Sequence, residues 1–326
     1  MKAILIQKHG GPENLVIRDV PDPTPRPGHV VIQVKAFGVN HAETHMRQGQ
    51  WPESAEISGI ECAGLVEADP SGNLARGRKV VAFMGGMGRT IPGSYAEYTS
   101  VPASNVVPID TTLPWVELAA IPESYATAWT CLFDNLELTA GETLIIRGAT
   151  SALGQAALNI ASHAGAFVIA TTRSAARAAA LEALGAKQVL LDGADLARRV
   201  RETRPEGIDA VLDLVGNSVV LDSLQAARRG GRVCEAGWLG GLAPIASFNP
   251  MLQLPSGVHF SLFASFMFGA PAFPLSRVPM QAIVDRVASG AYRARPARVF
   301  RFDQIQDAHR LMESSEANGK IVVALG

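Results

Sequence analysis

The stretch that decides the fold is Thr143-Leu-Ile-Ile-Arg-Gly-Ala-Thr-Ser-Ala-Leu-Gly-Gln155, which has the pattern of a buried strand, a turn of small residues and the start of a helix. Residues 143–146 are β-branched or apolar, as a buried parallel strand requires. Apolar residues then recur at helical spacing up to Gly165, and the apolar run 166–172 predicts a second strand. This βαβ unit has the length that a dinucleotide-binding fold uses.

The turn at residues 148–154 is suited to a phosphate group. Small side chains let the backbone approach the phosphate, and free N–H groups at the start of the helix point at it. Ala149, Ser151 and Gly154 stand at the three glycine positions of the strict G-x-G-x-x-G pattern. From this stretch alone, an ordinary α/β turn whose small residues serve close packing remains the alternative.

The end of the second strand indicates which dinucleotide would bind. A site that prefers NAD carries Asp or Glu there to hold the ribose hydroxyls. This chain has Thr172-Arg173-Ser174 instead, with Arg177 one turn later. Because guanidinium groups bind phosphate with a planar fork of donors, we predict NADP(H) as the cofactor. The alternative is that both arginines are solvated residues at a helix start.

Composition narrows the class of protein. The chain has 326 residues, enough for about two domains, and 48% of them are hydrophobic. A formal net charge of −1 gives no reason to expect nucleic acid or an anionic membrane as a partner. Cys62, Cys131 and Cys234 are far apart and form no disulfide framework, which predicts a cytoplasmic location. No run of about 18 apolar residues is present, so we expect no membrane span.

The pattern of the chain changes near residue 119. Before it, strands are expected at 3–7, 15–20, 29–36, 58–67, 79–83 and 94–100, with a short helix within 38–49. After it, strands and helices alternate as far as a sixth strand at 258–268, which predicts a parallel sheet with helices on both faces. A helix at 279–289 precedes the last elements, at 298–302, 304–313 and 319–325. The predicted fold class is therefore α/β.

Several motifs occur in one order along the chain and together resemble a known family. They are Gly38-Val-Asn40, Gly59-Ile-Glu61-x-Ala63-Gly64, Ser94-Tyr-Ala-Glu-Tyr98, the 148–154 turn, Leu184-Gly-Ala186, Asp213-x-Val-Gly216 and Asn318-Gly-Lys-Ile-Val322. In this order they resemble the medium-chain dehydrogenase/reductase superfamily, and within it the zinc-independent NADPH:quinone oxidoreductase branch. The resemblance covers nearly the whole chain.

The resemblance implies a domain plan and an assembly. A GroES-like, β-rich catalytic domain would span residues 1–118, with the C-terminal tail 290–326 returning to it. A Rossmann-type domain that binds NADP(H), with a doubly wound parallel sheet, would span residues 119–289. Members of the family are commonly homodimers or homotetramers, paired in many cases through the edge of the Rossmann sheet, which would lie near residues 258–268 here.

The chain departs from the zinc-dependent members of the family in its metal ligands. Those enzymes carry Cys where this chain has Asn40 and His where it has Ile60, so we predict no metal site. A different ligand set, made of His41, Glu43, His45 and Cys62, is the alternative that we considered. The literal H-E-x-x-H pattern is absent from this segment.

Candidate site residues follow from the residue chemistry and from the resemblance. Asn40 is predicted to offer an amide donor to the acceptor, while Glu43, His45 and Arg47 relay a proton or position it; a solvated helix face is the alternative for His45 and Arg47. Glu61 is predicted to be a buried structural carboxylate. The candidate cofactor-binding residues are Thr127 at the nicotinamide, Thr150, Ser151, Ala152 and Leu153 at the pyrophosphate, Thr172, Arg173 and Arg177 at the adenosine phosphate, and Gly216, Asn217, Gly237 and Lys320.

These residues predict an oxidoreductase that transfers hydride from NADPH to a quinone or a related conjugated carbonyl, because such acceptors delocalise the incoming charge without a Lewis acid. A 2-alkenal or enoyl-thioester reductase of the same branch is the first alternative. A dinucleotide-binding sensor or structural protein without turnover is the second.

Overall fold

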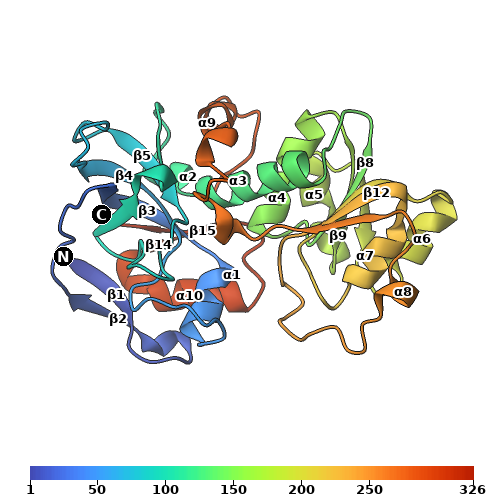
Figure 1. Cartoon of the computed structure of the whole chain (residues 1–326), viewed down its shortest axis with the longest axis horizontal. Coiled ribbons are helices and arrows are strands. Elements are labelled where there is room, and N and C mark those ends of the chain that lie inside the picture. Colours follow the sequence, from blue (N-terminus) through green and yellow to red (C-terminus); the bar gives the residue numbers. More distant parts are fainter. The chain divides into compact units, whose positions relative to one another are not determined.

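The computed structural model describes residues 1–326 and divides them into two compact units (Figure 1). Unit 1 comprises Met1–Ala126 and Phe266–Gly326, and unit 2 comprises Thr127–Ser265. Each unit has its own sheet and its own cluster of buried apolar side chains. No helix is both long enough and apolar enough to cross a membrane.

Unit 1 is built on a seven-stranded sheet in the order β14-β15-β3-β4-β5-β7, with β6 paired to β3. A separate antiparallel hairpin, β1 (Lys2–Ile6) with β2 (Leu15–Asp19), accompanies it. The strands of the sheet are β3 (His29–Val39), β4 (Glu61–Ala68), β5 (Lys79–Phe83), β6 (Tyr98–Pro102), β7 (Val106–Pro108), β14 (Arg298–Arg301) and β15 (Ile321–Ala324). The helices of unit 1 are α1 (His41–Arg47), α2 (Trp115–Leu118), α9 (Met280–Ala288) and α10 (Ile305–Glu313).

The C-terminal tail is part of the sheet of unit 1. Strand β15 lies antiparallel to β3, with Ile321 opposite Val39 and Ala324 opposite Ala36. Helix α10 buries Ile305, Ala308 and Met312 in the same apolar cluster as β3. Residues far apart in the chain, such as Lys320 and Asn40, are thereby brought into contact.

Residues 266–289 also lie in unit 1, whereas the domain plan that the family resemblance implied had them in the second domain. Two contacts explain their place. The ring of Phe268 packs edge-on against Phe83, with 5.3 Å between the ring centroids. The buried amide of Asn105 donates to the backbone oxygen of Phe268 over 3.0 Å. Periodicity within the segment carries no information about these contacts with distant strands.

Unit 2 has the predicted doubly wound parallel sheet, in the order β10-β9-β8-β11-β12-β13. Right-handed crossovers place α4 and α5 on one face and α6 and α7 on the other, as Figure 1 shows. Its strands are β8 (Thr143–Arg147), β9 (Phe167–Thr172), β10 (Gln188–Leu191), β11 (Ile208–Asp213), β12 (Ala227–Glu235) and β13 (His259–Leu262). Its helices are α4 (Ala152–His163), α5 (Ala178–Ala183), α6 (Leu196–Thr203), α7 (Val220–Ala226) and α8 (Pro250–Gln253), and α3 (Pro122–Thr130) begins in unit 1 and ends in unit 2.

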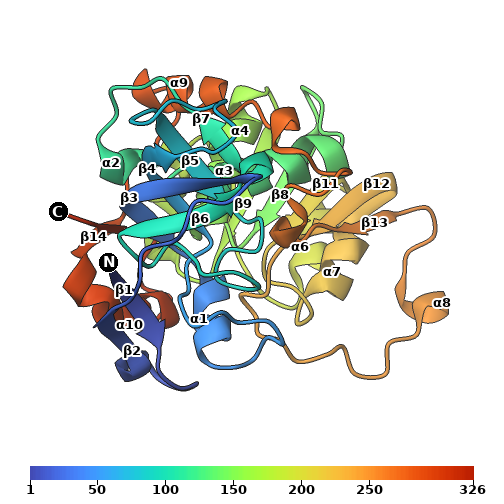
Figure 2. The ribbon, with the colours of Figure 1, turned by 60° about the vertical axis from the view of Figure 1, so that its left-hand side comes forward.

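Two predicted strands differ from the structure, and one observed strand was not predicted. The strand expected at 94–100 begins only at Tyr98, because Ser94 is turned toward β4, where its hydroxyl donates to Glu61 O over 2.6 Å. Strand β7 (Val106–Pro108) was not expected. The sixth strand of unit 2 is four residues long and so much shorter than the predicted 258–268, and Figure 2 shows the short helix α8 on the long connection that leads to it.

Candidate functional site

The turn between β8 and α4 has the geometry of a phosphate-binding loop. Gly148 adopts a φ of +80°, which only glycine takes without strain. Ser151 caps the helix: its hydroxyl accepts from Gly154 N over 3.0 Å and donates to Gly148 O over 2.9 Å. The backbone N–H groups of Thr150, Ala152 and Leu153 donate to no protein acceptor. Free N–H groups at the start of a twelve-residue helix are suited to an anion.

The close approach of the turn to α4 depends on Gly154. A Cβ at this position would lie 2.5 Å from Gly148 O and 2.7 Å from the Cα of Ala149. Both are backbone atoms, which cannot move aside as a side chain can. Helix α4 therefore packs against the turn as closely as only a glycine allows. A turn of this kind fits a pyrophosphate.

The end of β9 carries the residues predicted to select the cofactor. Thr172 is buried. Its hydroxyl donates to Ser174 O and accepts from Ser174 N, each over 3.2 Å. Arg173 is exposed, and its guanidinium makes no hydrogen bond or ion pair within the protein. Arg177 lies in the turn that follows, Ala175–Arg177. A free guanidinium at this position suits the 2′-phosphate of NADP(H).

A carboxylate near this end of the sheet is already engaged. Asp192, just after β10, accepts from Arg147 Nη2 at 2.6 Å and from Thr171 Oγ1 at 3.1 Å. Arg147 is fully buried and also pairs with Asp222 at 2.7 Å. Asp192 is therefore a partner of a buried arginine and not a free acceptor for ribose hydroxyls.

The carboxyl ends of β11 and β12 carry three further candidate residues. Gly216 has a φ of +88°, and its N–H donates to Asp213 Oδ1 over 2.9 Å. Asn217 donates its side-chain amide to Ala243 O over 2.9 Å. A Cβ on Gly237 would lie 2.8 Å from Leu214 O, so the two strand ends approach closely there. Thr127, the remaining candidate of unit 2, is a buried residue of α3.

In unit 1, the predicted catalytic segment begins with a capping box at the start of α1. Glu43 Oε2 accepts from Asn40 N over 2.8 Å, which joins the N-cap to the third residue of the helix. Glu43 Oε1 accepts from Ile60 N over 3.2 Å and from Asn40 Nδ2 over 3.2 Å. Glu43 is fully buried, and it ties α1 to the segment that leads into β4.

A second buried carboxylate, Glu61, joins Asn40 to the C-terminal tail. Glu61 Oε1 accepts from Asn40 Nδ2 over 3.0 Å and forms an ion pair with Lys320 Nζ. The ammonium of Lys320 also donates to Asn40 Oδ1 and, over 3.3 Å, to Ser124 Oγ. Glu61 Oε2 accepts from Glu123 N, at the start of α3, over 2.9 Å. We call Asn40, Glu43, Glu61, Ser124 and Lys320 the buried polar network.

The side-chain N–H donors of Asn40 and Lys320 are all used within the protein. Asn40 Nδ2 has two N–H bonds, one directed at Glu43 and one at Glu61. Lys320 has three, and three acceptors receive them. Asn40 therefore positions its neighbours and presents no free amide donor, and Lys320 lies in the network with 5% of its surface exposed rather than on an exposed strand end. Glu61 is fully buried, as predicted.

The pKa values of two groups are shifted here, those of Glu43 in the network and of His41 beside it. Burial raises the pKa of Glu43 to about 7, although the charge of Lys320 opposes the rise. Burial lowers the pKa of His41 to about 4, and the charges of His45 and Lys320 add to this. His41 is a half-buried residue whose neutral imidazole makes no hydrogen bond in the protein. It is the one side chain at the start of α1 with its hydrogen-bonding capacity left for a ligand.

His45 and Arg47 have other partners. His45 Nδ1 lies 2.6 Å from Gln50 Oε1, and its ring stacks on Trp51 at a centroid distance of 5.8 Å. Arg47 is fully buried and contacts His309, Glu313 and Gly10 O. Arg47 therefore joins α1 to α10 and does not face a ligand.

No three His, Cys, Asp or Glu side chains come close enough together to hold a metal ion. The alternative ligand set of His41, Glu43, His45 and Cys62 is thus not assembled.

Two buried residues were not predicted from the sequence: Ser124 of the network, and Glu235, an acid at the end of β12. The signal for Glu235 was a carboxylic acid within an otherwise apolar strand end. Ser124 gave no signal, because its role depends on a lysine 196 residues away.

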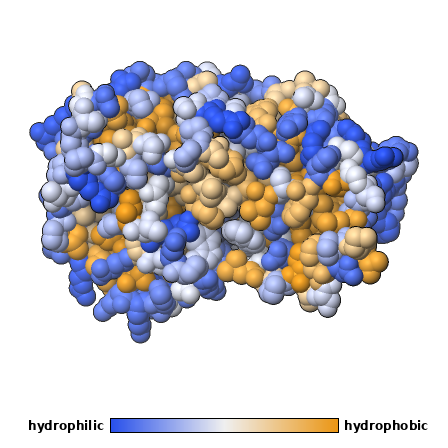
Figure 3. Space-filling view, in the orientation of Figure 1, coloured by the Kyte–Doolittle hydropathy of each residue, from blue (hydrophilic) through white to orange (hydrophobic).

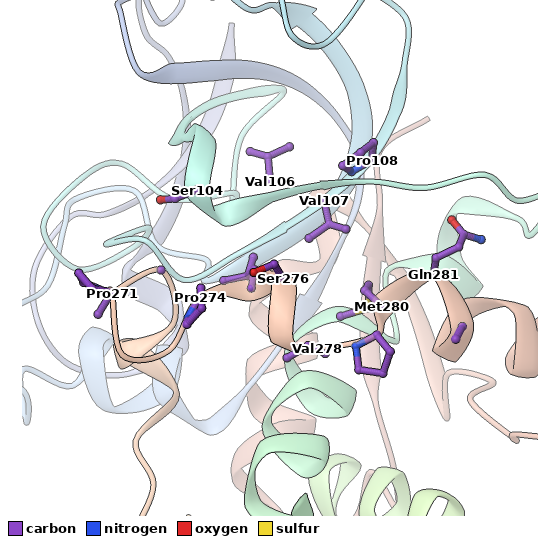
Figure 4. A pocket seen from close by; sticks show the side chains of 15 residues that line it. Ser104, Val106, Val107, Pro108, Pro271, Pro274, Ser276, Val278, Met280 and Gln281 are labelled. Atoms are coloured by element: carbon purple, nitrogen blue, oxygen red, sulfur yellow. The ribbon is translucent and has the colours of Figure 1, made fainter. Parts of the chain in front are cut away.

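An apolar cavity of about 820 Å³ lies elsewhere in unit 1, between β7 and the segment that leads into α9 (Figure 4). Val106, Val107, Pro108, Val278 and Met280 are among its lining residues. None of the lining residues has a titratable side chain, so this cavity has no group that exchanges protons.

Comparisons with known proteins agree with this geometry. Residues 26–111 match the alcohol dehydrogenase GroES-like domain and residues 184–323 match the zinc-binding dehydrogenase family. Quinone oxidoreductase of Rattus norvegicus is 30% identical over an alignment of 281 residues, which covers 81% of this chain and 81% of the other. A segment of the phenolphthiocerol/phthiocerol polyketide synthase of Mycobacterium tuberculosis is 31% identical over 98% of this chain, which spans only 14% of that protein.

Among solved structures, mycobacterial Rv1454c complexed with NADPH superposes with a TM-score of 0.86 at 27% identity, over 99% of this chain and 100% of the other. This neighbour and the quinone oxidoreductase relatives support NADP(H) as the cofactor, which the free N–H groups of the β8–α4 turn and the free Arg173 fit. The chain belongs to the medium-chain dehydrogenase/reductase superfamily, in its quinone oxidoreductase branch.

Proposed function

We propose that this protein is an NADPH-dependent, metal-free reductase that transfers hydride to a quinone or a related conjugated carbonyl compound. The observation that carries the proposal is the buried polar network. Where zinc-dependent relatives have metal ligands, this chain has Asn40 and Ile60, and the Asn40 amide is bound to Glu43, Glu61 and Lys320. An acceptor that spreads the incoming charge over a conjugated system has no need of a Lewis acid.

Bound NADPH supplies the hydride, and the residues of this chain hold the cofactor and serve the acceptor. The free N–H groups of the β8–α4 turn would hold the pyrophosphate, and Arg173, together with Arg177 in the turn that follows, would hold the 2′-phosphate. Asn40, Glu43 and Lys320 fix the start of α1, and this fixes His41. The neutral imidazole of His41 donates an N–H to the acceptor oxygen as its negative charge develops. His45 lies one turn further along α1 and positions the acceptor or relays a proton from solvent.

The second candidate function is reduction of the carbon–carbon double bond of a 2-alkenal or an enoyl thioester. The similarity to a segment of a polyketide synthase favours it. This reaction requires a proton donor to carbon, and we propose Tyr125 for that role. Tyr125 is buried on α3 and stacks on Tyr292 at a centroid distance of 5.8 Å.

The test is a panel of acceptors with NADPH and with NADH: a simple quinone, a 2-alkenal, an enoyl thioester and an unconjugated ketone, each with and without a chelator. Quinone reduction that prefers NADPH and is insensitive to chelator is the expected result. Activity confined to the alkenal or the thioester would establish the second function instead. Ketone reduction that the chelator abolishes would refute the metal-free mechanism. Cofactor binding without turnover of any acceptor would leave a sensor or structural role.

We also propose that the protein works in the cytoplasm as a homodimer or homotetramer. Its three cysteines are free and buried. Edge strand β13 exposes Phe260 (46%) and Leu262 (53%), an arrangement that favours pairing with another chain. Figure 3 shows further apolar side chains over α8, where Met251 and Leu252 are 89% and 82% exposed.

Light scattering on Leu262→Lys tests this assembly, with Leu191→Lys on the opposite edge strand β10 as the matched control. We expect the Leu262→Lys oligomer to dissociate and the Leu191→Lys oligomer to stay intact. An unchanged mass for Leu262→Lys would refute pairing through β13.

A further inference from the structure

Glu235, the last residue of β12, is a buried carboxylic acid whose side chain has no hydrogen-bond partner in the protein. Only 4% of its surface is exposed, and its buried Oε1 is unsatisfied. In the parallel ladder between β11 and β12 it lies directly opposite Asp213, which is fully buried. Two acidic side chains thus stand side by side at the carboxyl edge of the sheet, where such folds bind their ligands.

The two acids have different surroundings. Asp213 Oδ1 accepts from Val215 N and Gly216 N at 2.8 and 2.9 Å, and its Oδ2 accepts from Ser223 Oγ at 2.6 Å. Burial raises the pKa of Asp213, while these hydrogen bonds and the charge of Arg147 oppose the rise. Glu235 has no such donors. Burial, and then the charge of Asp213, raises the pKa of Glu235 to about 7. The pair therefore holds its proton on Glu235 and its negative charge on Asp213.

The charged groups around the pair are few. Arg147 of β8 is next to Asp213 in the same row, and it is paired with Asp192 and Asp222. Helix α7 has one acid, Asp222, whose carboxylate accepts hydrogen bonds from Ala197 N and from Arg147. On β13 the residue opposite Glu235 is Leu262, which has no charge. No cation faces Glu235, so its ionised form is uncompensated.

Glu235 is in contact with the part of unit 2 that contributes to the cofactor site. Its Oε1 lies 3.1 Å from where a Cβ of Gly216 would be, and Cδ1 of Trp238 lies 3.2 Å from that point. The N–H of Gly216 is one of the two backbone donors that hold Asp213. Asn217 and Gly237 adjoin the same turn. A change in charge at Glu235 therefore acts first on the β11–α7 turn, residues 214–219.

We propose that Glu235 is a positioning residue whose proton couples NADP(H) binding to pH. With Glu235 neutral, Asp213 holds Val215 and Gly216 and the β11–α7 turn keeps its place beside the cofactor. When Glu235 loses its proton, a second anion lies beside Asp213 in a buried position, and the turn that Asp213 holds is displaced. Binding of the cofactor thus favours the protonated form, and affinity falls as the pH rises through neutrality. The proposal rests on cofactor binding alone and does not depend on which acceptor is reduced.

The experiment measures the dissociation constants of NADPH and of NADH by nicotinamide fluorescence between about pH 5.5 and 8.5, on the full chain. NADH is included because it lacks the 2′-phosphate, which itself titrates near pH 6. Each unit by which cofactor binding raises the pKa of Glu235 corresponds to tenfold in affinity. We expect wild-type affinity for both cofactors to fall about tenfold from pH 6 to pH 8, relative to Glu235→Gln. Glu182→Gln, an exposed acid of α5, is the matched control and is expected to keep the wild-type profile.

Calorimetry in two buffers of different ionisation enthalpy gives the number of protons taken up on binding. Wild type is expected to take up a fraction of a proton with NADH at about pH 7.5, and Glu235→Gln none. A wild-type profile in Glu235→Gln, or no proton uptake by the wild type, would overturn the proposal. The wild-type calorimetry needs no variant, so it decides the matter even where Glu235→Gln fails to fold.

Discussion

Replacing Lys320 by methionine tests whether the buried polar network holds unit 1 together. The ammonium of Lys320 contacts Glu61, Asn40 and Ser124, with 5% of the lysine and none of Glu61 exposed to solvent. Methionine fills a similar volume but donates no hydrogen bond. In Lys320→Met, Glu61 therefore remains as a buried carboxylate without its counter-ion, and Glu43 loses the cation that opposes the rise of its pKa.

The expected cost follows from the burial of both partners. Removing one member of a buried ion pair typically costs about 3–5 kcal/mol of unfolding free energy, because the remaining charge is uncompensated. For a unit of this size, that corresponds to a fall in Tm of roughly 6–20 °C. The loss should be largest at pH 8, above the pKa of about 7 that Glu43 has in the presence of Lys320. It should shrink toward pH 5, where a buried carboxyl without a counter-ion takes up a proton.

Thermal and urea unfolding of the full chain measure the effect, and a double variant gives the decisive comparison. Lys320→Met/Glu61→Gln removes both charges, and it should recover at least half of the lost stability at pH 8. Lys2→Met is the control, since it breaks the exposed 3.6 Å pair with Asp19 and should cost less than about 1 kcal/mol. A Lys320→Met protein within about 1 kcal/mol of wild type at pH 8, or a double variant as unstable as the single, would refute the reasoning.

Four further variants test individual contacts. Arg173→Ala should weaken NADPH binding about tenfold to a hundredfold and leave NADH binding unchanged, because only the 2′-phosphate contact is lost; equal losses for both cofactors would contradict this. Gly154→Ala should weaken both cofactors at least tenfold by equilibrium titration, since the new Cβ would lie 2.5 Å from Gly148 O. Glu43 has a folded pKa of about 7, above its ordinary 4.5, so its contribution to stability is complete below pH 4.5 and declines by about 3 kcal/mol as the pH rises to 7. Urea unfolding of Glu43→Gln should lack this decline. The pH dependence that His309 contributes has the opposite direction, because burial lowers the pKa of His309 to about 3. The unfolding free energy should therefore fall by about 1.4 kcal/mol for each pH unit below 6.5, and His309→Gln should lack that fall.

The fold of unit 2 could be predicted from the sequence because the pattern of each strand and helix lies within a short stretch of the chain. The strand, turn and helix at Thr143 to His163 each have a pattern that a window of a dozen residues contains, and alternation of such elements fixes a parallel sheet. The sixth strand was overestimated for the opposite reason. Residues 258–268 are mostly apolar, but Phe268 packs its ring on Phe83 in unit 1 and not on a strand of unit 2.

Four residues of the buried polar network could be named from the sequence, but their hydrogen bonds could not be predicted. Asn40, Glu61 and Lys320 belong to the quoted motifs, and Glu43 follows Asn40 on the same segment. The assignment of the turn at 150–153 to a phosphate stays a prediction. Which donor meets which acceptor depends on β15 lying beside β3, and this contact joins residues 280 positions apart. An amide that looked available for a substrate is therefore saturated in the structure. Glu235 was missed because the apolar pattern of a buried strand predicts the backbone conformation and the size of its side chains. The pattern does not predict the charge of a single residue at the strand end.

The network also predicts that a cysteine in place of Asn40 would not by itself create a metal site. A cysteine in place of Asn40 would leave Glu43 and Glu61 each short of one donor and Lys320 short of one acceptor. Lys320 would remain within the same cluster, and its ammonium would repel a divalent cation at short range. A histidine in place of Ile60 would keep its backbone N–H on Glu43, so one oxygen of that carboxylate would already be engaged. The C-terminal tail thus supplies the positive charge of this cluster through Lys320, which contacts both Asn40 and Glu61.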